Sequence, residues 1–151
     1  MTKTLLLLML FSIPALEGRA QSKPAPKPGF VTEKSLLDGC GCSVYRTAED
    51  NKNDRFLFVS DMDREAFINL DGKDLKLRVL SWKEKTGQMM VGERSSETYA
   101  GGDVNVRLDF TVRRVCPPKD ESCEATWYDV KMTVTRKGQR TVVNAKGICG
   151  C

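Results

Sequence analysis

The chain has 151 residues, and its 24 Lys and Arg residues against 20 Asp and Glu residues give a formal net charge of +4. This length suits one domain that buries about two-thirds of its unfolded surface. A composition with 40% hydrophobic and 29% charged residues excludes gross disorder. The sequence contains no histidine, which excludes Ser-His and Cys-His nucleophiles, histidine general bases and histidine-ligated metal sites.

Residues 1–20 are expected to be a secretory signal peptide. Lys3 supplies a positive start, Leu5–Phe11 is an unbroken apolar run, and small residues occupy positions 18 and 20, which a signal peptidase recognises. The run is shorter than the roughly 20 residues that span a bilayer. A buried N-terminal helix is the alternative. The sequence therefore predicts an exported, soluble protein without a membrane span, either periplasmic or secreted.

Residues 21–29 are expected to form a proline-rich linker between the signal peptide and a single β domain over residues 30–151. Prolines at positions 24, 26 and 28 favour an extended, polyproline-like segment without a core of its own. No internal repeat and no second domain boundary is recognisable in the sequence.

Alternation of apolar and polar residues predicts three long antiparallel strands near the C-terminus. The third begins at Val142 and runs toward Cys149, and the first two have the apolar faces Val104, Val106, Leu108, Phe110, Val112 and Tyr128, Val130, Met132, Val134. Shorter extended segments are expected over residues 40–46, 56–60, 66–70, 75–82 and 88–94.

The turn signals agree with an all-β fold. Asp71-Gly72 predicts a tight hairpin, because type I′ turns need positive φ. No helical period continues for three turns, and residues 35–37 are expected to form a short turn at most. The fold class is therefore all-β, a single small antiparallel barrel or sandwich of about eight strands, with both architectures left open.

An even number of cysteines in an exported protein indicates structural disulfides. The six are Cys40, Cys42, Cys116, Cys123, Cys149 and Cys151. Cys116 and Cys123 bracket the loop between two long strands, and a bridge between them stabilises by about 2–3 kcal/mol in the chain-entropy model.

The other four cysteines form two Cys-Gly-Cys motifs, one at the start of the β domain and one at the end of the chain. Residues i and i+2 of a strand point to the same face, so each motif presents two thiols side by side. If the two strands are antiparallel, the motifs predict the bridges Cys40–Cys151 and Cys42–Cys149, which staple the first strand to the last.

Two other uses of these four thiols remain open. They are a Cys₄ site for Zn²⁺ or Cu(I), and a redox bridge between Cys40 and Cys42. Structural zinc pairs are usually separated by two to four residues, and an extended strand puts Cys40 and Cys42 near the upper limit of disulfide geometry. We expect structural disulfides, with no metal and no cofactor.

No catalytic constellation is marked by the sequence, so the protein is expected not to be an enzyme. The acidic stretch at residues 49–54 has Lys52 in a ligand position of an EF-hand-type loop and Arg55 where glycine is required, which favours a solvated turn. We expect a non-enzymatic binding or structural module of the bacterial envelope.

Basic residues of the C-terminal strands predict a face that attracts an acidic partner, either an envelope protein or an acidic polymer. They are Arg107, Arg113, Arg114, Lys131, Arg136, Lys137, Arg140 and Lys146. The alternative is the ordinary polar side of a sheet. Nucleic-acid binding is not expected, since it requires more positive charge and exposed aromatic residues.

The segment Ala66–Gly72, continued by Leu75 and Leu77, resembles a hairpin in the exported lysozyme-inhibitor barrels of bacteria. Ser95-Ser96-Glu97-Thr98-Tyr99 resembles the Ser-Gly-x-x-Tyr loop of that family, with serine in place of the glycine. The resemblance is confined to residues 66–99, and the two Cys-Gly-Cys motifs depart from the family's pattern.

The resemblance implies a second function, a periplasmic inhibitor of an envelope-directed enzyme. The polar loop expected at residues 95–102, which contains Ser95, Ser96, Glu97, Thr98 and Tyr99, would then enter the cleft of that enzyme. A thiol redox or metal-binding protein that uses the Cys-Gly-Cys motifs is the third function that the sequence leaves open.

Overall fold

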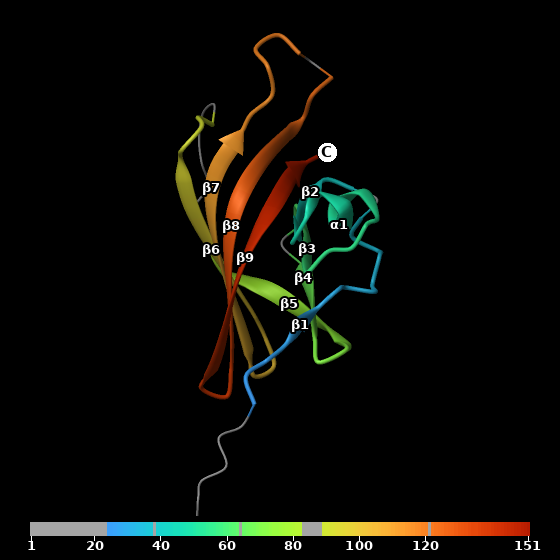
Figure 1. Cartoon of the computed structure of the whole chain (residues 1–151), viewed down its shortest axis with the longest axis vertical. Coiled ribbons are helices and arrows are strands. Elements are labelled where there is room, and N and C mark those ends of the chain that lie inside the picture. The colour runs from blue at the N-terminus through green and yellow to red at the C-terminus, as the bar shows by residue number, and fades with distance from the viewer. Residues whose placement is uncertain (1–23, 38, 64, 83–88, 121) are drawn as a thin grey trace, which may run out of the picture.

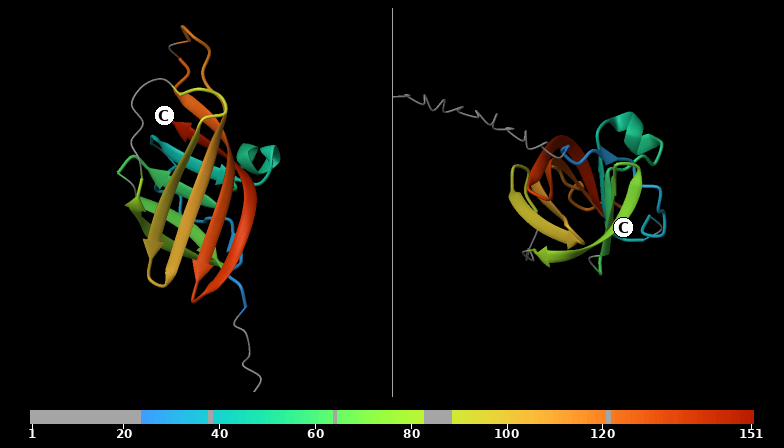
Figure 2. Two further views of the ribbon diagram at one scale, coloured as in Figure 1. Left: turned by 90° about the vertical axis from the view of Figure 1, so that its left-hand side faces the viewer. Right: turned by 90° about the horizontal axis from the view of Figure 1, so that it is seen from below.

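Eight strands close into an antiparallel barrel (Figures 1 and 2). The computed structural model describes residues 24–37, 39–63, 65–82, 89–120 and 122–151, so the expected signal peptide lies outside the described residues. The elements are β1 (Pro28–Gly29), β2 (Gly41–Tyr45), α1 (Ala48–Lys52), β3 (Phe58–Asp61), β4 (Glu65–Leu70), β5 (Lys73–Ser81), β6 (Arg94–Gly101), β7 (Val104–Arg114), β8 (Ala125–Arg136) and β9 (Gln139–Gly150).

The barrel is closed by the pairing of β2 with β9, in addition to the pairings of consecutive strands. Strands β4 to β9 form an antiparallel meander, β9 pairs with β2, and β2 returns through β3 to β4. The end-on view of Figure 2 shows the resulting ring. The predicted all-β fold is confirmed, and of the two architectures left open the structure is a barrel.

Alternation along β7 and β8 separates the barrel interior from its outer face, as predicted. Val106 pairs with Val134 and Phe110 with Val130, and all four side chains are buried. The opposite wall contributes apolar side chains to the same core, namely Val44, Phe58, Ala66, Ile68, Leu70 and Leu77. The interior is therefore filled by packed side chains.

Two hairpins of the barrel have two-residue turns in which both residues have positive φ. Asp71 and Gly72 have φ of 54° and 84° between the paired residues Leu70 and Lys73, which confirms the predicted tight turn. Residues 137 and 138 join β8 to β9 with φ of 49° and 80°. Glycine at the second position of each turn adopts positive φ without a steric penalty.

A second apolar cluster lies outside the barrel, against β2, β3 and the end of β9. Val59 pairs with Ser43 in the outward-facing register, yet only 1% of its surface is exposed. It is covered by Val31 and Phe56, with Tyr45 and partly buried side chains around them. The chain before β2 and the segment around α1 thus cover this side of the barrel (Figure 1).

The end of the expected linker contacts the barrel. Pro28 and Gly29 form β1 and pair with Leu70 and Asn69 of β4. The Thr141 hydroxyl donates a hydrogen bond to the carbonyl oxygen of Pro26, at 2.6 Å. The described part of the linker is therefore extended, as expected, but it is docked between β4 and β9.

Two segments differ from the predicted elements. The acidic stretch at residues 49–54 contributes to helix α1, which Thr47 and Asp50 begin with a capping box: the Asp50 amide donates to the Thr47 hydroxyl and the Thr47 amide to the Asp50 carboxylate. The extended segment expected at 88–94 contains a turn at residues 90–93, since Gly92 has φ of 86° and the Glu93 amide donates to the Met90 carbonyl, and Arg94 begins β6.

The predicted disulfide pairing is confirmed. Cys40 is bonded to Cys151 and Cys42 to Cys149, so the two Cys-Gly-Cys motifs are joined across the β2–β9 pairing. A third bridge, Cys116–Cys123, closes the loop between β7 and β8. In the part of the chain that the structure describes, no helix is long and apolar enough to cross a membrane.

Candidate functional site

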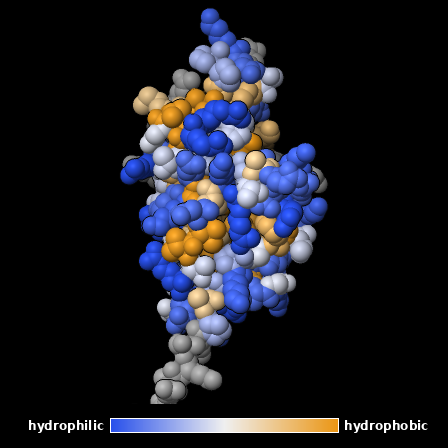
Figure 3. Space-filling view, in the orientation of Figure 1, coloured by the Kyte–Doolittle hydropathy of each residue, from blue (hydrophilic) through white to orange (hydrophobic). Residues whose placement is uncertain are grey.

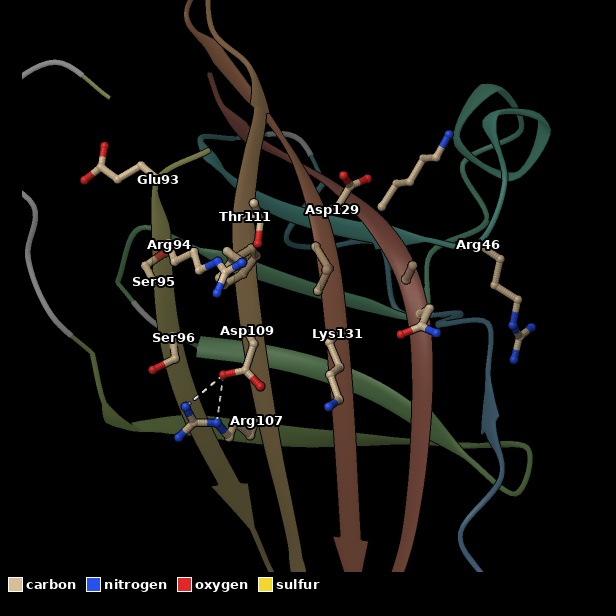
Figure 4. Close-up of a pocket in the computed structure, with 15 residues that line it drawn as sticks. Arg46, Glu93, Arg94, Ser95, Ser96, Arg107, Asp109, Thr111, Asp129 and Lys131 are labelled. Atoms are coloured by element: carbon tan, nitrogen blue, oxygen red, sulfur yellow. Dashed lines mark hydrogen bonds and ion pairs between the residues drawn. The ribbon is translucent and has the colours of Figure 1, made fainter. Parts of the chain in front are cut away.

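The outer face of β6–β9 carries a broad, shallow depression of about 1170 Å³ (Figure 4). Alternate residues of paired strands point to the same side of a sheet. Two cross-strand rows therefore line the depression, Arg94–Thr111–Asp129–Lys146 and Ser96–Asp109–Lys131–Asn144. Arg46, which follows β2, lies at the margin beyond β9.

The aspartates of the depression lie close to arginines. Arg107 binds the Asp109 carboxylate through Nη2, at 2.8 Å, and through Nε, at 2.9 Å (dashed lines in Figure 4). Arg113, just outside the depression, lies 3.9 Å from Asp129. Each aspartate of the depression thus has an arginine beside it, closely for Asp109 and loosely for Asp129.

Three cations on the strands β6, β8 and β9 of the depression lack such a partner. Arg94, Lys131 and Lys146 form no ion pair with any residue that the structure describes. Their charges face solvent beside serine, threonine and asparagine side chains, which donate and accept hydrogen bonds. The depression is thus a polar surface with an excess of available positive charge.

The basic residues predicted as one face are divided by the structure. Arg107, Lys131 and Lys146 lie in the depression, whereas Arg136 and Lys137 bind Asp103 at the opposite end of the strands. The remaining three are Arg113 beside Asp129, Arg114 stacked on the Trp127 ring at 3.4 Å, and exposed Arg140. Sequence position alone could not separate paired from available cations, because the ion pairs depend on register.

The five residues expected in a binding loop form part of strand β6, so the expectation of a loop at Ser95–Gly102 is wrong. All eight residues of β6 pair with β7, and that pairing stabilises an extended segment with few apolar side chains. Ser96 and Thr98 point outward, and Ser96 lines the depression. Ser95, Glu97 and Tyr99 point into the barrel.

Two inward-facing polar groups of β6 form a hydrogen bond with each other. The Tyr99 hydroxyl donates to the Glu97 carboxylate at 2.7 Å, and the Tyr128 hydroxyl contacts the Met89 sulfur at 3.3 Å. Burial is the main cause that raises the pKa of Tyr128, and the nearby charges of Glu97 and Glu93 raise it further, against a hydrogen bond with Thr126 that lowers it. Tyr128 therefore remains protonated at neutral pH.

The two Cys-Gly-Cys motifs join β2 to β9 covalently. Cys40 and Cys42 are bonded to the other motif rather than to each other, and all six cysteines are paired. Among the described residues, no group of three or more His, Cys, Asp or Glu side chains is arranged to hold a metal ion.

Comparison with protein-family models, with curated proteins and with solved structures finds no match to this chain.

Sequence reasoning missed Arg94 and Arg46 as members of the depression. Arg94 was expected at the end of a strand that would precede a loop, whereas it begins β6 and faces Thr111 across the pairing. Arg46 is placed by the end of β2, where its guanidinium donates to the Pro28 carbonyl at 2.9 Å. The sequence carries no clear local signal for Arg94, because two of the inward-facing residues that follow it, Ser95 and Glu97, are polar.

Proposed function

We propose that this protein is a non-enzymatic binding module of the bacterial envelope, exported to the periplasm or secreted, that binds an acidic surface of an envelope protein through the outer face of β6–β9. The observation that carries the proposal is the depression itself, in which Arg94, Lys131 and Lys146 face solvent without an ion pair among the described residues. Such cations accelerate encounter with a negative surface and contribute specificity.

The mixed chemistry of the depression supports a protein as the partner. The paired aspartates Asp109 and Asp129 and the hydroxyl groups of Ser96 and Thr111 alternate with the available cations. A mosaic of this kind is typical of protein–protein interfaces, in which complementary groups fix the register of the partner. A polyanion would instead be attracted by a uniformly basic stripe, and the aspartates interrupt one here.

Charge reversal tests this proposal. The double variant Lys131→Glu with Lys146→Glu is compared with the matched pair Lys34→Glu with Lys52→Glu, which adds the same charge at exposed positions outside the depression. A complex isolated from envelope extract is reconstituted with the purified partner, and its Kd is measured at low and high salt. We expect at least tenfold weaker binding for the depression variant and a much smaller change for the control pair.

Two results would contradict the proposal. Equal weakening by both double variants would show that net charge, not this face, determines binding. Binding to polyglutamate with no protein complex in the extract would instead make the partner an acidic polymer.

An enzyme inhibitor is the second candidate, and the structure favours a different element for it. The β7–β8 loop projects beyond the barrel (Figure 1) and is closed by the Cys116–Cys123 bridge. Inside it, the Asp120 carboxylate accepts hydrogen bonds from the amide and hydroxyl of Ser122. A rigid projecting loop suits entry into an enzyme cleft, because little conformational entropy is lost on binding.

Lysozyme turnover in the presence of the protein distinguishes the candidates. Inhibition that disappears when Pro118 and Lys119 are replaced by glycine, and persists in the Lys131 and Lys146 double variant, would favour the inhibitor. Turnover that is unaffected at micromolar protein is the result expected for the binding module.

A further inference from the structure

Part of β9 has a neighbouring strand on one side only. β9 is a strand of 12 residues and pairs with β8 over its whole length, but β2 has only five residues and pairs with Lys146–Gly150. Residues 139–145 of β9 therefore have a strand on one side only. Figure 2 shows this half of β9 at the margin of the four long strands.

The register identifies the main-chain groups that face the open side. The Val44 carbonyl accepts a hydrogen bond from the Leu57 amide, so Val44 turns its peptide groups toward β3 and Tyr45 turns its own toward β9. Tyr45 pairs with Lys146, whose peptide groups thus face β2. Peptide groups alternate along a strand, so Arg140, Val142 and Asn144 direct their N–H and C=O groups to the open side.

These groups have no hydrogen-bond partner among the residues that the structure describes. The Val142 side chain is 45% exposed at the centre of the open edge. An edge of unpaired N–H and C=O groups is a template for another strand, and natural barrels usually protect such edges.

The nearest segment of the chain does not complete the wall. Residues 24–29 run beside β9, where Pro26 is buried and its carbonyl accepts a hydrogen bond from the Thr141 hydroxyl, but no backbone–backbone hydrogen bond joins the described part of this segment to β9. Prolines at positions 24, 26 and 28 have no N–H group to donate, so the segment cannot form a regular ladder with β9. The linker therefore lies near the open edge without pairing to it.

We propose that the open edge of β9 binds an extended acidic peptide segment of a partner protein, which adds as one further strand. The three N–H and three C=O groups of Arg140, Val142 and Asn144 supply main-chain pairing, as in other strand-addition sites. Arg140 and Lys146 flank the edge on the outer face, and neither forms an ion pair with a described residue. The edge thus fits carboxylates on both sides of an apolar residue that faces Val142.

This proposal does not depend on the depression of β6–β9. The outer face binds through side chains, whereas the edge binds through main-chain groups, and the two share Asn144 and Lys146 of β9. The single variant Lys131→Glu, without the change at Lys146, therefore separates the two: it should weaken binding at the depression and leave the edge unchanged, because Lys131 lies on β8.

Amide hydrogen exchange measured by NMR tests the geometry directly. In the free protein we expect the amides of Arg140, Val142 and Asn144 to exchange at least tenfold faster than those of Thr141 and Val143, which bind β8. The probe is the capped peptide acetyl-Thr-Glu-Thr-Val-Thr-Glu-Thr-amide. It should slow exchange at the three edge amides at least tenfold.

Two control peptides separate main-chain pairing from charge. The same peptide with alternate residues N-methylated keeps its charge but cannot form the ladder, and it should give no protection. The peptide with lysine in place of glutamate keeps the ladder and should bind at least tenfold more weakly. The proposal would be overturned if the N-methylated peptide gave the same protection. It would also be overturned if the unmodified peptide failed to slow exchange at the amides of Arg140, Val142 and Asn144.

A proline variant provides the matched test in the protein. Val142→Pro removes the N–H that faces the open side without deleting a hydrogen bond to β8, whereas Val142→Thr keeps both the N–H and the branched side chain. We expect at least tenfold weaker peptide binding for the proline variant and unchanged binding for the threonine variant.

If the proline variant does not fold, Arg140→Glu replaces it and should weaken binding of the acidic peptide at least tenfold. If Val142→Pro folds and binds the peptide as the wild type does, or if Arg140→Glu does so in its place, the proposal is overturned. Concentration-dependent protection of the same amides without peptide would show pairing with a second copy and would also overturn it.

Discussion

Both sides of the barrel wall are antiparallel sheet, but their outer faces differ in burial and polarity. Outside β2 and β3, Val59 and Tyr45 are buried beneath the preceding chain and the segment around α1. Outside β6–β9, the corresponding positions carry charged and hydroxyl side chains that line an open depression. Figure 3 shows hydrophilic residues over most of the visible surface, with separate hydrophobic patches.

The difference separates a covered side, whose apolar contacts stabilise the fold, from an open side, for which we propose a role in binding. A strand that is covered on both faces carries apolar residues in succession, whereas a strand with one solvated face alternates. Residues 56–59, Phe-Leu-Phe-Val, are all buried, and residues 104–112 alternate. We therefore expect substitutions on the covered side to change the free energy of unfolding and substitutions on the open side to change binding.

The largest expected effect on the free energy of unfolding comes from the two disulfides that join the two sides. The bridges Cys40–Cys151 and Cys42–Cys149 connect β2 of the covered side to β9 of the open side, over sequence separations of 111 and 107. Replacing all four cysteines by serine should lower the free energy of unfolding by about 4–5 kcal/mol in the chain-entropy model. Urea unfolding monitored by tryptophan fluorescence measures the change.

Removal of one bridge is the control for this prediction. Cys40→Ser with Cys151→Ser leaves the long loop closed by the second bridge, so the loss should be far smaller than for the fourfold variant. Equal losses from the two variants would contradict the view that loop closure, rather than local packing of the sulfurs, is the main contribution of the two disulfides.

The second prediction compares one substitution on each side. Phe56→Ala removes a side chain that is 7% exposed in the outer apolar cluster and should destabilise by about 3 kcal/mol. Thr111→Ala, in the depression, should change the free energy of unfolding by less than about 0.5 kcal/mol. Thermal unfolding followed by circular dichroism measures both, and similar losses from the two variants would refute the proposed division.

The interior of the barrel could be predicted from the sequence because its signals are local. Alternation over β7 and β8, the Asp71-Gly72 turn and the spacing of the cysteine motifs each require only neighbouring residues and the geometry of a strand. These signals were sufficient for the fold class and for the three disulfides.

The outer surfaces could not be predicted in the same way, because they depend on contacts between distant segments. The cover over Val59 comes from residues 30–37 and from Phe56, and the open edge of β9 exists because β2 ends after five residues. Strand β6 was mistaken for a loop because its pairing with β7, and not its own composition, makes it extended. Helix α1 had a local signal in Thr47 and Asp50, which fit a capping box, and it was overlooked.

A smaller effect on the free energy of unfolding is expected where residues 30–37, the segment that covers β2 and β3, are attached to the barrel. The Asp74 carboxylate on β5 accepts hydrogen bonds from the Thr32 amide at 2.8 Å, the Thr32 hydroxyl at 2.6 Å and the Glu33 amide at 2.7 Å. Its other oxygen accepts from the Asn69 amide group at 2.7 Å. One carboxylate thus fixes the start of the covering segment to β4 and β5.

These contacts make the attachment depend on pH. Partial burial raises the pKa of Asp74, but the hydrogen bonds from Thr32, Asn69 and Glu33 outweigh burial and lower the pKa below its usual value. A lowered pKa in the folded state contributes stability above the unfolded pKa of about 3.9, and that stability is lost as the pH falls through the folded value.

Asp74→Asn should therefore destabilise the protein by about 1 kcal/mol at pH 7, since the carboxylate is only partly buried and charged hydrogen bonds at such sites are modest. The difference between the wild type and this variant should shrink as the pH falls from 5 to 2, because protonation removes the same charge from Asp74. Asp63→Asn, at an exposed position in the β3–β4 turn, is the control and should give no such trend. A constant difference across this pH range would show that the carboxylate charge does not hold the covering segment, and that the covered side depends on its apolar contacts alone.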